Sequence, residues 1–296
     1  NMNNMNNNMN NMNNNMNNNM NNNMNNMNNN INQMNNMNPM NNIRGITNFS
    51  INCESSYANS VLQSLASLDC IKNWYKNFNM SIIMNNSSTL TKDFIMLLKV
   101  LYSGQKPDSS SIIQTANNKS FYICKKEIGK NPYDFLSSFL VILHSENNLP
   151  INPNFDMDLI NKPSLENMRN NEHMYSIFAF YFQQTLNSIV SQCFFNIENY
   201  TFKCKSCPPA YLYKCKKIFE FDVDKYRMYR DEANNQRIGK NLNLEECFKC
   251  YSGGYKDKCL LCRKNIGTSY KKIFSTTKII IIYFKRNTHL YNGDID

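Results

Sequence analysis

The sequence contains no run of apolar residues long enough to span a bilayer, and no charged-then-apolar leader is visible. We therefore expect no membrane partner. The first of the 296 residues is Asn rather than Met, which predicts that the chain starts inside a longer protein.

A dense basic block is also missing. Lys and Arg number 32 against 22 Asp and Glu, giving a formal net charge of +10, but the lysines are dispersed along the chain. A solvated basic surface is therefore the preferred interpretation, and we expect no direct nucleic-acid partner.

Cysteine is abundant, but its pattern does not indicate disulfides. There are 11 cysteines, an odd number, and six of them form three C-x-x-C pairs. Such pairs are typical of zinc sites in a reducing compartment, so we expect an intracellular protein of the cytoplasm or nucleus. The pairs are Cys204 with Cys207, Cys247 with Cys250, and Cys259 with Cys262.

Residues 1–42 consist almost entirely of Asn and Met. Their Met residues recur for a time at spacings of three and four, which is formally a heptad stripe. Asn is a poor helix former, so low-complexity disorder is the preferred prediction. The remaining residues, 43–296, suit one large domain.

Residues 45–65 join a cysteine and a polar turn to the start of an amphipathic helix. Val61, Leu62 and Leu65 recur at helical spacing after Tyr57. A thiol just before a helix has a lowered pKa because of the positive end of the helix dipole, so Cys53 is a candidate nucleophile. A buried structural cysteine is the alternative.

The segments 45–48 and 57–65, with Cys53 and Asn48 at the family's spacing, resemble the cysteine box of ubiquitin-specific proteases, which have a papain-like fold. The resemblance implies that Cys53 attacks the carbonyl after the last glycine of ubiquitin and that Asn48 is an oxyanion donor. Unlike the family, this chain has three extra residues, 54–56, before Tyr57.

The position of these extra residues decides the chemistry. If they extend the helix, Cys53 moves by about 4.5 Å and roughly 300° around the axis. If they lie before Ser56 instead, Ser56 takes the place of the cysteine, as in the spliceosome-associated pseudoprotease branch that this register resembles. An unactivated serine is a poor nucleophile.

Periodicity predicts a helix at residues 94–101, and a second helix is expected to start at Ser109 with a serine cap. A third helix is predicted at 131–144, and this segment resembles the family's second box, with Asp134 in place of Glu. His144 matches a structural position of that box. The polar segment 147–174 reads as a long loop or insertion.

Residues 188–203 are expected to form strands leading into Cys204 and Cys207, and 218–223 to form the strand after this first knuckle. The apolar run 279–284 predicts a buried strand. By the family's order of motifs, the resemblance selects Cys259 and Cys262 as the second knuckle, with Cys247 and Cys250 as the alternative pair. Four cysteines would then hold one structural Zn²⁺.

Histidine is scarce, and this limits the chemistry. The family's histidine box is not found in this sequence, and neither His173 nor His289 has its context. The chain is therefore not expected to assemble a thiol–imidazole pair by itself, and the histidine would come from sequence beyond Asp296.

Together these motifs predict an α+β, papain-like fold: a helical thumb at 43–187, zinc-stapled β fingers at 188–275 and the start of a palm at 276–296. The implied function is hydrolysis of the isopeptide bond after the C-terminal glycine of ubiquitin, with ubiquitin or ubiquitinated proteins as partners. The alternative is a catalytically inactive ubiquitin-binding scaffold, such as one in an RNA-processing complex.

Overall fold

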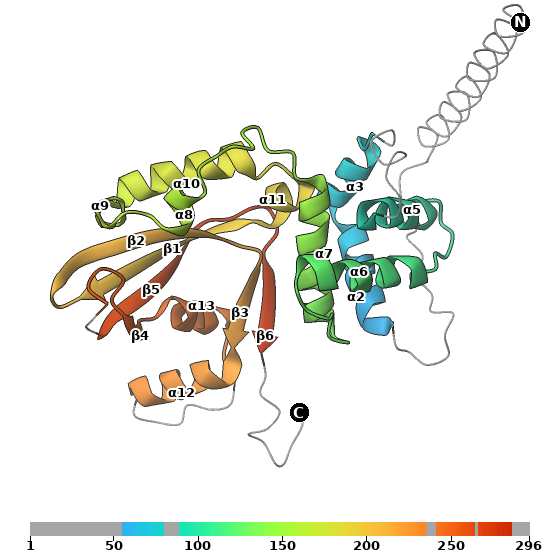
Figure 1. Ribbon diagram of the computed structural model, residues 1–296. Helices are drawn as coiled ribbons and strands as arrows, with labels where there is room; N and C mark the ends of the chain where they lie inside the picture. Colours follow the sequence, from blue (N-terminus) through green and yellow to red (C-terminus); the bar gives the residue numbers. More distant parts are fainter. Residues whose placement is uncertain (1–54, 80–88, 235–240, 264–265, 286–296) are drawn as a thin grey trace, which may run out of the picture.

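A group of helices precedes a β-sheet that has helices on both faces (Figure 1). The computed structural model describes residues 55–79, 89–234, 241–263 and 266–285. The helices of the first group are α2 (Ser56–Ser67), α3 (Asp69–Lys76), α5 (Leu90–Tyr102), α6 (Ser110–Ile123) and α7 (Pro132–Asn147).

Helix α7 lies at the centre of this group and contacts α2, α5 and α6. Phe135, Phe139 and Leu143 recur every four residues along α7, and all three are fully buried. Because that spacing places them on one helical face, they form the core against which the other helices pack. Asn131 caps α7 by accepting a hydrogen bond from the Asp134 amide, and Pro132 occupies the first helical position.

A half-buried carboxylate links three of these helices. Glu146, near the end of α7, accepts hydrogen bonds from the amides of Leu90 and Thr91 at the start of α5 and pairs with Lys119 of α6 at 2.6 Å. Burial alone would raise the pKa of Glu146, but these donors outweigh it, and the pKa is lowered.

The start of α6 differs in detail from the predicted serine cap. Ser109 precedes the helix, but its hydroxyl donates to Oδ1 of Asn59 at 2.5 Å instead of capping α6. The Asp108 carboxylate accepts the hydrogen bond from the Ser110 amide. The buried amide of Asn59 on α2 thus has a polar partner, which its burial requires.

The prediction of a long loop at 147–174 holds only for residues 148–157, which form no helix or strand. The rest of the segment contains α8 (Asp158–Asn161), α9 (Leu165–Arg169) and the start of α10 (Asn171–Thr185). Ser164 and Asn170 cap α9 and α10, and Met174 and Phe178 are buried near the sheet. Capping and a few large apolar anchors therefore outweigh the polar composition of the segment.

The main sheet is antiparallel throughout, with the order β2-β1-β5-β4. Its strands are β1 (Asn196–Cys204), β2 (Cys207–Lys216), β4 (Tyr255–Lys258) and β5 (Ile266–Ser275). The predicted strand starting at residue 188 is wrong at its beginning, because α11 (Ile189–Phe194) precedes β1. A capping box formed by Ser188 and Ser191 starts this helix.

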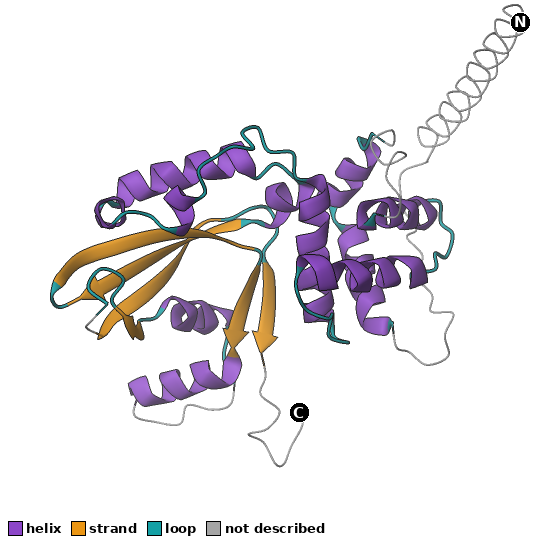
Figure 2. Cartoon of the chain, in the orientation of Figure 1, coloured by secondary structure: helices purple, strands orange, loops and turns teal. Residues whose placement is uncertain are grey.

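A second, parallel pair of strands, β3 (Ile218–Asp222) and β6 (Ile281–Lys285), lies between the main sheet and α7 (Figure 2). The prediction of a buried strand at 279–284 is only partly right. Phe284 is 45% exposed, and β6 has β3 as its partner within the described residues. Tyr133 of α7 stacks on Tyr283 of β6, with 4.1 Å between the ring centres, and this contact joins the pair of strands to the helices.

Two further helices, α12 (Val223–Asn234) and α13 (Leu244–Ser252), lie on the opposite side of the sheet from α10 (Figure 1). Phe219, Phe221 and Tyr251 form a small buried aromatic cluster there. Among the described helices, none is both long and apolar enough to cross a membrane.

Candidate functional site

Four cysteines from two turns meet at one end of the sheet. Cys204 ends β1 and Cys207 begins β2, so the first pair flanks a tight hairpin turn. Cys259 and Cys262 follow β4 in the turn that leads to β5. Because β5 pairs with β1, the two turns lie side by side.

The geometry of the cluster suits a tetrahedral metal ion. All four Sγ atoms lie within 4.8 Å of one another, and those of Cys204 and Cys262 are 4.0 Å apart. Zn–S bonds of about 2.3 Å in a tetrahedron place sulfur atoms about 3.8 Å apart. The Ser206 amide also donates to Sγ of Cys204 at 3.5 Å, which would stabilise a thiolate.

A glycine allows the two turns to approach each other. A Cβ atom added to Gly267 would lie 2.5 Å from the carbonyl oxygen of Lys203, the residue before Cys204. Any side chain at this position would push β5 away from β1. In the neighbouring turn, Arg263 has a φ of 55° and its amide donates to the Cys259 carbonyl at 2.9 Å.

The alternative second pair lies elsewhere. Cys247 is only 2% exposed and packs in the aromatic cluster of α13, where burial raises its pKa. Cys250 donates from its thiol to the carbonyl of Tyr226 at 3.8 Å. The structure thus groups Cys259 and Cys262, and not Cys247 and Cys250, with the first knuckle.

The proposed nucleophile Cys53 and oxyanion donor Asn48 lie outside the described residues. The structure does describe the helix that follows them. Ser55 is the N-cap residue of α2, and Ser56 is its first helical residue, so two of the three extra residues belong to the start of this helix. The first turn of α2 contains no acidic side chain that would neutralise its positive end.

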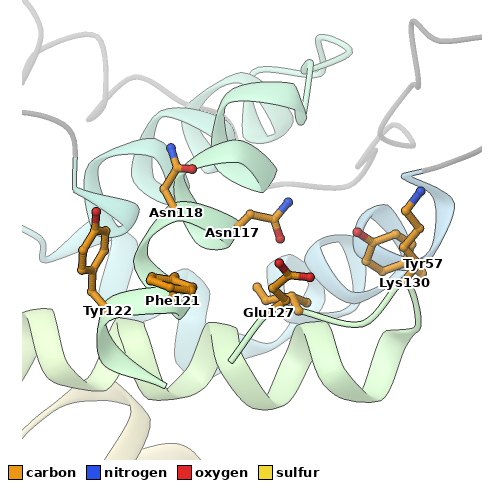
Figure 3. A pocket seen from close by; sticks show the side chains of 8 residues that line it. Tyr57, Asn117, Asn118, Phe121, Tyr122, Glu127 and Lys130 are labelled. Atoms are coloured by element: carbon orange, nitrogen blue, oxygen red, sulfur yellow. The ribbon is translucent and has the colours of Figure 1, made fainter. Parts of the chain in front are cut away.

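A cavity of about 590 Å³ lies beside the first turn of α2 (Figure 3). Its lining is mixed, with two aromatic residues of α6, two amides, a carboxylate and an ammonium group. These residues include Tyr57, Asn117, Asn118, Phe121, Tyr122, Glu127 and Lys130. The sequence did not lead us to predict this cavity. The feature that could have indicated it is the pair of aromatic residues at 121–122 in an otherwise polar helix. Both rings are exposed, Phe121 to 62% and Tyr122 to 72%.

The two described histidines lie in different surroundings. Nδ1 of His144 lies 2.7 Å from the Ser188 hydroxyl, and its ring packs against Phe195. Burial, with a smaller contribution from the charge of Lys217, lowers the pKa of His144 to about 4. His173 is exposed, and its backbone amide donates to the side chain of Asn170.

The fold is an α+β fold of the ubiquitin-specific protease type, with a four-cysteine cluster in its β region. This confirms the predicted fold class. No protein-family model and no curated protein matches the sequence.

Solved structures resemble the chain in fold. One is the yeast SAGA DUB module with mutant Sgf73, with a TM-score of 0.51 and 14% identity, covering 84% of this chain and 49% of the matched chain. Another is the Ubp8–Sgf11–Sgf73–Sus1 SAGA DUB module, with a TM-score of 0.50 and 14% identity, covering 84% and 47%. This chain therefore spans about half the length of the chains that it matches.

Proposed function

We propose that this chain is part of a deubiquitinating cysteine hydrolase in which Cys53 is the nucleophile and Asn48 an oxyanion donor. The main support is the fold of the ubiquitin-specific protease type, in which α2 begins directly after the segment that contains Cys53. The first turn of α2 holds no acidic side chain, and the positive end of a helix favours a thiolate just before it.

The proposed reaction has two steps. The Cys53 thiolate attacks the carbonyl carbon after the last glycine of ubiquitin, and the lysine amine of the substrate leaves with a proton as a thioester forms. Water then attacks the thioester, releasing the ubiquitin carboxylate and regenerating the thiol. The described residues do not identify the imidazole that moves these protons: Nδ1 of His144 lies 2.7 Å from the Ser188 hydroxyl, and His173 is exposed on α10.

We also propose that Cys204, Cys207, Cys259 and Cys262 bind one structural Zn²⁺. The closeness of the four sulfur atoms supports this assignment. The ion would join the two turns and take no part in bond cleavage. The hydrolase proposal also implies that ubiquitin or ubiquitinated proteins are the partners and that the protein is intracellular.

A catalytically inactive ubiquitin-binding scaffold, for example in an RNA-processing complex, is the second candidate. The observation that favours it is Ser56 at the first helical position, directly before Tyr57, where the resembled family has its cysteine. Without a base, a serine at this place would not react.

The two candidates are separated by ubiquitin that carries a C-terminal thiol-reactive group. The full-length protein should form a covalent adduct, Cys53→Ala should form none, and Ser56→Ala should react like the wild type. If zinc-loaded, folded protein forms no adduct but still binds ubiquitin, the hydrolase is refuted and the scaffold is favoured. An adduct that persists in Cys53→Ala would refute the assignment of the nucleophile.

A further inference from the structure

Alternating lysine and tyrosine side chains form a row that crosses the four strands of the main sheet and continues onto α12. We refer to it as the lysine–tyrosine row. Its members are Lys214 on β2, Tyr200 on β1, Lys271 on β5, Tyr255 on β4, and Lys225 and Tyr229 on α12.

The contacts along the row are cation–π interactions. The ammonium of Lys214 lies 5.1 Å from the ring centre of Tyr200, and that of Lys271 lies 5.9 Å from Tyr200 and 5.2 Å from Tyr255. The ammonium of Lys225 is 5.3 Å from the same Tyr255 ring. All these distances fall within the range of attraction of about 6 Å. Each of the two tyrosine rings therefore holds two lysines.

The rings are themselves fixed by hydrogen bonds. The Tyr200 hydroxyl donates to the carboxylate of Glu198 at 2.8 Å, and the Tyr255 hydroxyl donates to the carbonyl of Cys250 at 2.8 Å. Glu198 is fully buried and also accepts a hydrogen bond from Tyr251. Because the rings are fixed, the lysines above them lose little further freedom when they bind a ligand.

The lysines of the row form no ion pair within the part of the chain that the structure describes. No carboxylate there lies within 4.0 Å of the ammonium of Lys214, Lys225 or Lys271. The nearby acidic groups are engaged by other donors. Glu198 accepts from tyrosines, Glu220 accepts from Tyr133 and pairs with Lys216, and Asp222 accepts from the backbone of Lys225.

These like charges also disfavour one another. Burial lowers the pKa of Lys271. The Glu198 carboxylate acts in the opposite direction, but the charges of Lys216 and Lys225 also lower this pKa, and the net shift is downward. Bringing cations together on a partly buried surface costs free energy unless an anion is bound there. This cluster of lysine ammonium groups therefore favours the binding of an acidic ligand.

We propose that the lysine–tyrosine row binds an acidic segment of a partner protein through carboxylate side chains. Charge complementarity supports this occupant. Single-stranded nucleic acid is disfavoured because the rings of Tyr200 and Tyr255 are already covered by lysines and are not free platforms for bases. The proposal does not depend on hydrolase activity.

The test uses the full-length, zinc-loaded protein and a fluorescein-labelled oligoglutamate peptide, with binding followed by fluorescence anisotropy. A triple variant, Lys214→Gln with Lys225→Gln and Lys271→Gln, removes three charges from the row. The matched control removes three exposed lysines of the helical part, Lys76→Gln, Lys92→Gln and Lys106→Gln, and so has the same net charge. We expect the row variant to bind about tenfold more weakly, and the control to bind within about twofold of the wild type.

A second variant distinguishes a loss of binding from a loss of folding. Lys225→Glu changes a single exposed residue in the first turn of α12, where a carboxylate is compatible with the helix dipole. It should weaken peptide binding about threefold or more with an unchanged melting temperature. Equal losses in the row and control triples, no binding by the wild type, or tighter binding of a labelled single-stranded oligonucleotide than of the peptide would each overturn the proposal.

Discussion

Replacing Cys262 by serine tests the proposed zinc site at the end of the sheet. Structural zinc sites contribute about 10–16 kcal/mol of binding free energy, so each of four equal ligands accounts for about 2.5–4 kcal/mol. Losing one ligand should weaken zinc binding by roughly 10²- to 10³-fold. A loss of this size is a large part of the net stability of a domain, which is about 5–15 kcal/mol.

The structure predicts where the loss would appear. Cys262 lies in the turn before β5, and the pairing of β5 with β1 reaches Lys203 and Thr268 next to the cluster. Backbone amides at this end of the sheet should lose protection from hydrogen exchange, whereas those of α7 in the helical core should keep it. The melting temperature should fall by about 5–15 °C.

Zinc content by mass spectrometry and hydrogen exchange are the measurements, and Cys250→Ser is the matched control. Cys250 belongs to a C-x-x-C pair outside the cluster, and a serine hydroxyl can still donate to the carbonyl of Tyr226. The control should keep one zinc ion per chain. Retention of zinc by Cys262→Ser, or its loss from Cys250→Ser, would contradict the assigned ligand set.

Three other predictions concern packing and titration. Gly267→Ala should destabilise the protein by about 1–3 kcal/mol in chemical denaturation, since its Cβ would clash with the Lys203 carbonyl; unchanged stability would show that the strands have room. The folded pKa of His144, about 4, lies below its ordinary 6.5, so its neutral form stabilises the fold above pH 6.5 and this contribution is lost as pH falls towards 4. The denaturation midpoint should therefore drop more between pH 7.5 and 5 in the wild type than in His144→Gln, and equal drops would argue against the buried neutral ring. Glu146→Gln should lose about 2 kcal/mol at pH 7, with a deficit that shrinks as pH falls below 4.5, because the lowered carboxyl pKa makes its contribution depend on ionisation; a pH-independent deficit in the same denaturation assay would refute this cause.

The helices of the core were predictable because their apolar residues repeat at helical spacing. Leu62 and Leu65 on α2, and Phe135 and Phe139 on α7, are buried as that periodicity requires. The cysteine pairs were equally visible, because metal ligands must be closely spaced along each turn. The burial of Cys247 became visible only in the folded chain.

Features that depend on contacts distant in sequence were not predictable. Helices α9 and α10 arise in a polar segment because Met174 and Phe178 find a sheet to pack against, and the sequence does not reveal that sheet. The exposure of Phe284 reflects which strands pair with β6. The neighbouring positions of Tyr200 and Lys271 depend on the register of β1 with β5, which local residue preferences do not determine.

The order in which the cysteines are synthesised leaves the proposed zinc site incomplete for part of translation. Cys204 and Cys262 are 58 positions apart, so the first pair leaves the ribosome about 3–12 s before the last ligand at a rate of about 5–20 residues per second. During this interval the nascent chain presents an incomplete pair of thiols, which is open to oxidation or to capture of another thiophilic metal ion. With zinc bound there as proposed, correct assembly of the β-sheet depends on the redox state and the metal supply of the cell during translation, in addition to the stability of the finished fold.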